Sequence, residues 1–433
     1  MKIGLRSYLN IKSEFVKNAL TLTVGTSIAQ AIPAFFYPVI GRIFTPEEFG
    51  IMATIMSITA IIAVLAVGRY EGSILIADTK NDAANIIVFI LILSFAILSV
   101  ILAILLLFSN FIAETFETPL IKNWLFICPL SAFLSIIYVC YNEWCVKNKY
   151  FVNLSWNKII NSSSATSGKL LFGFYKISSN GLIIGDVIGK AATALTCVFR
   201  AIKKDKDSFS NISFSRMKKL AIRYIEFPKF SLPGALLNTI GGQLPVILIG
   251  IFYNSIEVGF FAMTMSVLSV PSSVISAAIR DTFRQRANED YKKTGQCRGI
   301  FIKTLRMLTV ASVLGLFTLI FLLPAIFSFV LGQQWRISGE YSQIMMPALA
   351  LSFISNSLSG VLVIAEKMKT GFLYQIYYLF ITFASLTIGF VLFGDIKLTL
   401  LCYSIGIGSA YLLELFLNYK YSLPLNESCS KCG

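Results

Sequence analysis

The stretch FPKFSLPGALLNTIGGQLPVILIG, residues 227–250, is apolar enough to cross a bilayer but poorly suited to lie in lipid. It contains three prolines, four glycines and two side-chain amides: Pro228, Pro233, Pro245, Gly234, Gly241, Gly242, Gly250, Asn238 and Gln243. Proline removes a backbone hydrogen bond, glycine weakens a helix, and an unpaired amide in hydrocarbon costs free energy. A helix of this composition is expected to face protein or water rather than lipid.

The composition of the chain is that of an all-α integral membrane protein. Of its 433 residues, 56% are hydrophobic and 14% are charged, and the mean hydropathy is +0.75. In soluble domains, by contrast, about a quarter of the residues are charged. Ten apolar runs of about 20 residues are each able to cross about 30 Å of hydrocarbon, and two less obvious spans, 154–176 and 179–200, bring the prediction to about twelve transmembrane helices. They lie at roughly 18–43, 49–72, 84–108, 121–142, 154–176, 179–200, 228–252, 259–279, 304–331, 341–365, 371–393 and 396–418.

The distribution of charge gives the predicted orientation. The fifth span, Leu154 to Lys176, is too polar to be found by hydropathy alone, but without it every later loop would change sides. With it, and with both termini in the cytoplasm, about thirty of the 37 Lys and Arg lie on the cytoplasmic side, as the positive-inside rule requires. The net charge of +15 is therefore explained by topology and needs no nucleic-acid partner.

A weak internal repeat divides the chain into two halves. A shift of 209 positions aligns Gly25–Ser57 with Gly234–Ser266, with eight identities in 33 positions. Because this shift equals six spans, we expect two parallel six-helix lobes around a central cavity. The predicted segments are a basic lead-in on the membrane surface, an N-lobe, a basic cytoplasmic linker, a C-lobe and a cytoplasmic tail, at residues 1–17, 18–202, 203–226, 227–419 and 420–433.

The first span of each half is interrupted by proline. Corresponding broken helices in two halves point to a transport site at their interface, although kinks can also serve helix packing alone. We expect hinges at Pro33, Pro38, Pro233 and Pro245, and we expect the amides of Asn238 and Gln243 to face the cavity.

The fifth and sixth spans carry side chains that lipid does not accommodate. Asn157, Asn161 and Lys169 make the fifth span polar on more than one face, so we expect it to line a wet cavity. Asp186 and Lys190 are four residues apart on the sixth span and can pair, with a structural or a functional role. The same span predicts a close helix contact through three small residues, Gly181, Gly185 and Gly189.

Two arginines lie near the cytoplasmic ends of spans. Arg69 belongs to GRYE (residues 68–71), and Arg280 stands at the position equivalent to Glu71 in the second half. Arg69 can extend to lipid headgroups, or both can join Lys169 and Lys190 in a cationic lining suited to a diphosphate. Coupling to H⁺ or Na⁺ would need carboxylates, because the chain has no histidine; the candidates are Glu71, Asp186 and Glu366.

No metal site and no cofactor are predicted. There is no histidine, and the eight cysteines include one CxxC, formed by Cys429 and Cys432 in the tail. A zinc site would lack ligands, so we expect these two thiols to be reduced and solvated.

Five stretches resemble the polysaccharide flippases of the MOP superfamily, which are bacterial exporters of lipid-linked O-antigen and capsule repeat units. They are GRYE (68–71), KLLFGFYKISSNGLIIGDVIGK (169–190), FSLPGALLNTIGGQLPVIL (230–248), EVGFFAMTMSVLSVP (257–271) and GQQWRISGEYSQIMMP (332–347). The resemblance covers nearly the whole chain. One departure is the pair Gln333 and Gln334, where the family pattern has an acidic residue.

The resemblance implies a multi-pass flippase of the bacterial cytoplasmic (inner) membrane rather than an enzyme. By alternating access it would move an undecaprenyl-diphosphate-linked oligosaccharide to the outer leaflet, for O-antigen, lipopolysaccharide or other surface polysaccharide. The expected partners are this substrate, membrane lipids and the polysaccharide polymerase machinery, and the chain is expected to be a monomer.

Three other functions stay open at this point. An ion-coupled drug or small-molecule exporter of the same fold would prefer an acidic, aromatic pocket. A peptidoglycan-precursor flippase would be expected to have more than twelve spans. A membrane polysaccharide polymerase or glycosyltransferase would need a catalytic site, and the one DxD, Asp205-Lys206-Asp207, lies in a short basic linker.

Overall fold

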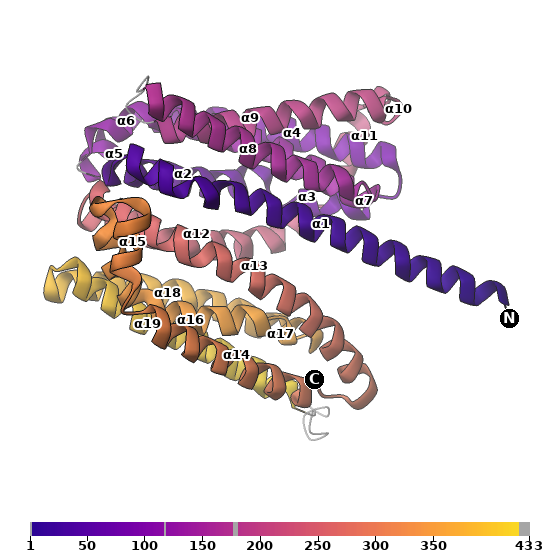
Figure 1. Ribbon diagram of the computed structural model, residues 1–433. Helices are drawn as coiled ribbons and strands as arrows, with labels where there is room; N and C mark the ends of the chain where they lie inside the picture. Colours follow the sequence, from indigo (N-terminus) through magenta and orange to yellow (C-terminus); the bar gives the residue numbers. More distant parts are fainter. Residues whose placement is uncertain (1, 117, 176–180, 424–433) are drawn as a thin grey trace. The chain divides into compact units, whose positions relative to one another are not determined.

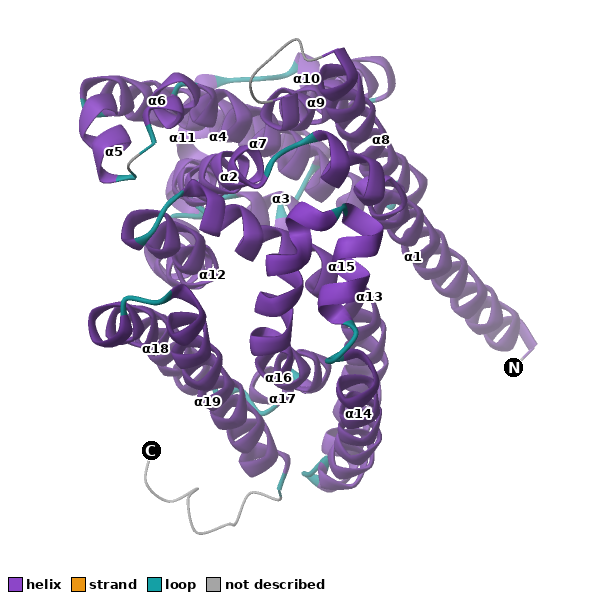
Figure 2. Cartoon of the chain, turned by 60° about the vertical axis from the view of Figure 1, so that its left-hand side comes forward, coloured by secondary structure: helices purple, strands orange, loops and turns teal. Residues whose placement is uncertain are grey.

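The computed structural model describes residues 2–116, 118–175 and 181–423, and all regular structure in these ranges is helical (Figure 2). The predicted all-α fold is thereby confirmed. The chain divides into two compact units, unit 1 (Met1–Thr239) and unit 2 (Ile240–Gly433). The predicted segment boundaries stay a prediction, and the tail cysteines Cys429 and Cys432 lie outside the described residues.

Unit 1 is built from long helices joined by short ones (Figure 1). The helices are α1 (Lys2–Ile43), α2 (Pro46–Val67), α3 (Glu71–Ile76), α4 (Lys80–Leu107), α5 (Ser109–Thr115), α6 (Pro119–Leu125), α7 (Ile127–Lys147), α8 (Phe151–Tyr175), α9 (Gly181–Lys204), α10 (Lys206–Ser210) and α11 (Phe214–Arg223). Residues 2–17, predicted as a lead-in on the membrane surface, belong to the same helix as the first span.

Unit 2 begins within α12 (Leu232–Phe252). The helices that follow are α13 (Ser255–Thr294), α14 (Arg298–Leu319), α15 (Leu323–Leu331), α16 (Arg336–Leu358), α17 (Val361–Ile364), α18 (Met368–Phe393) and α19 (Ile396–Ser422), with a short 3₁₀ turn at Gln333–Trp335. Within this unit α16 packs against α13 and α19, and α18 packs against α19.

The described helices confirm a multi-pass membrane protein. Eight of them are long and apolar enough to cross a membrane, or ten if two bent pairs each count as one span. The polar helix α8 and the helix α14 are not among these ten, although they have 25 and 22 residues. The total of twelve spans therefore stays a prediction.

The proline-rich stretch at residues 227–250 folds as a π-helical turn followed by a regular helix. The turn is Phe227–Ser231, with Pro228 near its start, and Pro233 lies in the first turn of α12. Pro228 stands at the start of the turn, where proline replaces a backbone donor that a helix start leaves unpaired. Pro245 is the one proline inside α12, and Pro33 and Pro38 lie inside α1.

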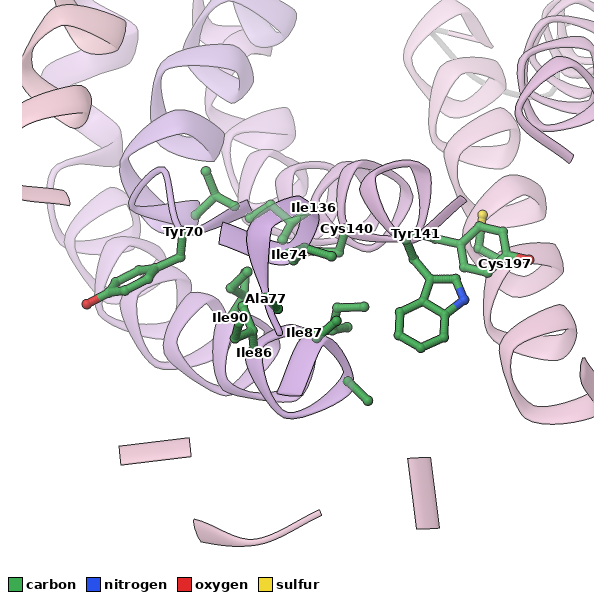
Figure 3. Close-up of a cluster of buried hydrophobic side chains, with 14 of the residues drawn as sticks. Tyr70, Ile74, Ala77, Ile86, Ile87, Ile90, Ile136, Cys140, Tyr141 and Cys197 are labelled. Carbon is green, nitrogen blue, oxygen red and sulfur yellow. The ribbon is translucent and has the colours of Figure 1, made fainter. Parts of the chain in front are cut away.

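The hydrophobic core of unit 1 lies between α2, α3, α4 and α7. Figure 3 shows part of it, with Ile74 of α3, Ile86 and Ile90 of α4, and Ile136 of α7 close together. All four side chains are almost fully buried. The outward face of α4 is apolar too, as the exposed Phe95 shows, so this helix has an apolar face for the core and another for lipid.

The first residue of the DxD motif, Asp205, has a structural role. Asp205 is buried, and its carboxylate accepts hydrogen bonds from Trp144 Nε1 at 3.1 Å and from the Tyr150 hydroxyl at 3.3 Å. Trp144 itself is fully buried. These contacts join the end of α9 to α7. They occupy the Asp205 carboxylate oxygens, which would otherwise have to bind the metal ion of a nucleotide sugar.

The linker between the halves is tied to unit 1 by ion pairs. Arg216 of α11 pairs with Asp82, in the first turn of α4, at 2.7 Å, and Arg223 pairs with Asp78, two residues before α4, at 2.5 Å. The Tyr70 hydroxyl also donates to the backbone oxygen of Ala221. The basic linker is therefore a folded part of the unit.

The helices α8 and α9 pack closely against each other, as the glycine spacing predicts. A Cβ on Gly185 would lie 2.5 Å from the backbone nitrogen of Lys169, and one on Gly189 would lie 2.6 Å from the Ala165 Cβ. The helix α1 approaches α8 in a similar way, because a Cβ on Gly25 would lie 2.3 Å from the Ser155 Cβ. Only glycine permits these distances.

We predict that Gly185→Ala lowers the thermal stability of the purified protein in detergent. Alanine improves helix propensity by about 1 kcal/mol, but overpacking a close contact costs about 1–3 kcal/mol. The matched control is Gly371→Ala in α18, where no atom of the described residues lies within 4 Å of the new Cβ. A Gly185→Ala protein that melts at or above the temperature of the control would contradict the close contact.

Candidate functional site

Unit 1 contains a polar cavity of about 370 Å³. It is lined by residues of α1, α7, α8 and α9: Thr26, Ala29, Gln30, Ser135, Tyr138, Lys158, Asn161, Ser162 and Lys190. All of them except Ala29 have polar side chains. The volume is in the range of small-molecule sites, about 300–1,000 Å³, and the polar ends of these side chains supply charged and hydrogen-bonding groups. The cavity therefore suits a charged or hydroxyl-rich ligand.

Lys190 enters this cavity with its charge already compensated. Its Nζ lies 2.8 Å from a carboxylate oxygen of Asp186, so these residues form the pair that their spacing allows. The same ammonium donates to the Ser131 hydroxyl at 2.8 Å. Both partners hold the lysine in one position, and the ion pair adds little net charge to the cavity.

Lys158 carries the positive charge that has no such compensation. Its Nζ donates to the Thr26 hydroxyl at 2.8 Å, which joins α8 to α1. Among the described residues it has no carboxylate within ion-pair distance. An ammonium inside a membrane protein favours a nearby anion, so Lys158 can attract an anionic ligand to the cavity.

Hydrogen-bonding groups surround the two lysines. Gln30 Oε1 is buried and has no hydrogen-bond partner among the described residues, although it lines the cavity. The Ser135 and Ser162 hydroxyls and the Asn161 amide lie on the same walls. Cations and amide or hydroxyl groups together match the chemistry of a phosphorylated sugar, which offers both negative oxygens and hydroxyls.

The structure separates the other predicted residues of the fifth span from this cavity. Asn157 is fully buried, accepts a hydrogen bond from Arg200 at 2.9 Å and contacts Asn142, so it joins α8 to α9 and α7. Lys169 is not among the lining residues. It lies close enough to Asp186 to be attracted by that carboxylate, and it is repelled by Lys190.

Arg69 and Glu71 pair with each other at a sharp turn. The distance between Arg69 Nη1 and the Glu71 carboxylate is 2.9 Å, and the arginine side chain is 45% exposed. Gly68 and Arg69 both have φ of 60°, which ends α2 and starts α3 within three residues. A non-glycine residue in this conformation is uncommon and is often retained for function.

The remaining predicted residues lie on α12 and in unit 2. Asn238 and Gln243 belong to α12, and Arg280 lies on α13. Glu366 is exposed, with φ of 57°, in the turn between α17 and α18. None of them lines the cavity of unit 1. Their assignment to a shared site, and that of the hinge prolines, stays a prediction.

Sequence reasoning missed Ser135 and Tyr138 of α7 as site residues. It also missed four residues on α1 and α8: Thr26, Gln30, Lys158 and Ser162. A signal for them existed, because Thr26 and Gln30 are four residues apart on one helix, and Lys158 and Ser162 are four apart on another. Two polar stripes at this spacing on spans that cannot both face lipid are expected to face each other.

No cluster of three metal ligands is found among the described residues. A comparison with curated proteins found no match. The family model described as polysaccharide biosynthesis protein matches residues 39–339, which is more than half of the chain.

The chain belongs to the polysaccharide biosynthesis protein family.

Solved structures of the MOP superfamily have the same fold as this family member. The lipid II flippase MurJ, in an inward closed conformation, has a TM-score of 0.75 at 15% identity. The match covers 93% of this chain and 87% of the MurJ chain. A multidrug resistance MATE transporter in an inward-facing conformation has a TM-score of 0.65 at 13% identity, with coverages of 92% and 93%. A MOP superfamily transporter from Pyrococcus furiosus has a TM-score of 0.61 at 11% identity, with coverages of 93% and 95%. The predicted family resemblance is confirmed.

We predict that a cysteine at position 162 reacts with charged thiol reagents, faster with an anionic than with a cationic one. Lys158 lies one turn away and attracts the anionic reagent, and it also favours the reactive thiolate. The measurement is the labelling rate of Ser162→Cys in a background with Cys402, Cys429 and Cys432 replaced by serine; the other five cysteines are buried.

The control is Ser94→Cys, because Ser94 is fully buried and bonds to the Ala66 backbone oxygen. Equal rates for both reagents at position 162 would contradict a cationic cavity, and equal labelling at positions 94 and 162 would contradict a cavity open to water.

Proposed function

We propose that this polysaccharide biosynthesis protein is a flippase that moves undecaprenyl-diphosphate-linked oligosaccharide repeat units from the cytoplasmic to the outer leaflet of the bacterial inner membrane by alternating access. The observation that carries the proposal is the cavity of unit 1, in which Lys158 and Lys190 lie among hydroxyl and amide groups. The structural similarity to MurJ, a lipid II flippase, supports a lipid-linked substrate.

The chemistry of the cavity favours a diphosphate together with sugar. Lys158 supplies an uncompensated positive charge, and Lys190 supplies a donor that Asp186 and Ser131 hold in place. A lysine ammonium acts as a point charge toward phosphate and can contact it from several directions. Gln30, Asn161 and Ser162 offer donors and acceptors for sugar hydroxyls.

The size of the cavity suits a part of such a substrate and excludes the rest. A volume of about 370 Å³ holds the charged group and a little sugar. The remaining sugars would extend into water, and the polyprenyl chain would stay in the bilayer. Moving the polar part alone through the protein removes the largest energetic cost, because lipid rejects charge and accepts the hydrocarbon tail.

A drug exporter of the same fold is the weaker candidate. The similar MATE structures are multidrug resistance transporters, but a cationic drug would be repelled by Lys158 and would leave the polar groups of this cavity unpaired. In the P. furiosus transporter, a reversed polarity of the binding pocket suggests a different function, which agrees with pocket charge deciding the substrate on this fold.

Coupling to H⁺ or Na⁺ belongs to the proposal as well. Asp186 and Glu71 are paired with Lys190 and Arg69, and Glu366 is exposed. Glu414 on α19 differs from them, because its carboxylate accepts hydrogen bonds from the Ser355 and Tyr374 hydroxyls and has no cation within ion-pair distance in the described chain. A carboxylate held by hydroxyls in a helix bundle is suited to binding a proton or a sodium ion.

We predict that Glu414→Gln removes the dependence of transport on a cation gradient. The amide can neither ionise nor bind Na⁺ as a carboxylate does, so an imposed gradient no longer drives movement. The measurement is translocation of a fluorescent lipid-linked disaccharide in proteoliposomes with either a pH or a Na⁺ gradient. Glu289→Gln, an exposed carboxylate on α13, is the control. An unchanged gradient dependence in Glu414→Gln would exclude Glu414 as the coupling group.

The substrate is tested in cells that lack this chain and express variants. We predict that Lys158→Gln and Lys190→Gln each lower the rate of repeat-unit export about tenfold, the effect of losing one charge-assisted contact. Lys158→Arg, which keeps the charge, should retain most of the activity. The measurement is the amount of lipid-linked repeat unit on each leaflet, together with surface polysaccharide.

The matched control is Lys219→Gln on α11, an exposed lysine outside the cavity. Repeat units that accumulate on the cytoplasmic leaflet in the Lys158 and Lys190 variants alone support the flippase. Repeat units that cross normally but fail to polymerise would point to an enzyme, and normal polysaccharide with altered drug sensitivity would point to an exporter.

A further inference from the structure

Unit 2 contains a groove of about 430 Å³ between α13 and α14. It lies near the turn that joins these two helices, which run in opposite directions. The lining residues are Ala278, Ile279, Thr282, Phe283 and Arg286 of α13, and Ile300, Lys303, Thr304 and Met307 of α14. It shares no residue with the lysine cavity of unit 1, and a ligand in it is independent of the proposed function.

Two cations lie at one end of this groove. Arg286 and Lys303 both line it and are exposed. Among the residues that the structure describes, neither has an ion pair or a hydrogen bond from its side chain. The nearby acidic residue Glu289 accepts a hydrogen bond from Gln285 instead. The groove therefore offers two uncompensated donors of positive charge to one anion.

Apolar side chains continue from the cations along both helices. On α14, Lys303 is followed on the same face by Met307, Val310 and Leu314, which are all exposed. Their spacing of four, three and four residues keeps them in one line. On α13 the same spacing, read toward the cations, relates Ile275, Ile279, Thr282 and Arg286.

The length of this apolar line fits one leaflet of a bilayer. Eleven residues separate Lys303 from Leu314, which is about 16 Å of helix, and half of a hydrocarbon core of about 30 Å is about 15 Å. Lys303 directly precedes the span predicted at residues 304–331, and Arg286 lies seven residues beyond the span predicted at residues 259–279. This is the level of lipid headgroups, on the cytoplasmic side in the predicted orientation.

We propose that the groove between α13 and α14 is a binding site for one anionic phospholipid of this leaflet. Arg286 and Lys303 hold the headgroup phosphate, and an acyl chain lies along Met307, Val310 and Leu314. Charge complementarity selects an anionic lipid over a zwitterionic one, because the second positive charge has no partner when the headgroup carries its own cation. Lipid bound here would brace two helices that a turn of three residues joins at one end only.

The test is a titration of the purified full-length chain with dioleoyl-phosphatidylglycerol and with dioleoyl-phosphatidylcholine, followed by native mass spectrometry. We expect tighter retention of the anionic lipid, and about tenfold weaker retention in the double variant Arg286→Gln/Lys303→Gln. A second variant, Thr282→Trp, fills the groove without changing its charge and should lower the occupancy as well.

The matched control is Lys292→Gln/Lys293→Gln, which removes the same charge near the end of α13 outside the groove. Full retention by this control, together with loss in the other two variants, supports the site. If both double variants lose the lipid equally, the retention reflects general attraction between basic helix ends and anionic lipid, and the groove is not a specific site. Unchanged retention in Arg286→Gln/Lys303→Gln or in Thr282→Trp, or equal binding of both lipids, would overturn the proposal.

Discussion

The close contact between α8 and α9 determines where the polar groups of unit 1 lie. A Cβ added to Gly168 would lie only 2.9 Å from the Gly185 Cα, so the backbones of α8 and α9 are in contact along a row of glycines. At this distance there is no room for lipid or for large side chains, and polar residues beside the seam must pair with each other or face water. Asn157 takes the first course and bonds to Arg200, whereas Asn161, Lys158 and Lys190 line the cavity.

The two lysines of the cavity differ in how far neighbouring groups compensate their charge. Lys190 pairs with Asp186 and bonds to the Ser131 hydroxyl, and these contacts offset much of the free-energy cost of burying its charge. Removing Asp186 would leave this buried charge without its ion-pair partner. Lys158 has a hydroxyl only, so its charge is the one that a ligand can neutralise with a net gain. Binding of an anion therefore costs least next to Lys158, and Lys190 serves to orient it.

The fold was predictable from the sequence because the patterns that determine it are local. Hydropathy, the bias of Lys and Arg between loops and the glycine spacing each act through neighbouring positions. The site was predictable only in part. Asn157 and Lys158 are adjacent and about 100° apart on one helix, so composition marks both as unsuited to lipid but cannot say which faces the cavity. The same composition marks Lys169, which lies outside the lining, and the DxD pattern does not reveal that Asp205 accepts a hydrogen bond from Trp144.

The two units share a repeat but differ in the charge of their interiors. Unit 1 places lysines on α8 and α9, where they face hydroxyls and amides. One polar cluster of unit 2 is built from tyrosines around a carboxylate, with Tyr374, Tyr378 and Tyr411 in successive ring contact and Glu414 bonded to Tyr374. Opposite preferences follow, for an anion in unit 1 and for a cation in unit 2. In the proposed flippase, the lysines of unit 1 would bind the anionic headgroup and Glu414 of unit 2 would bind the coupling cation, so the two halves would serve different ligands.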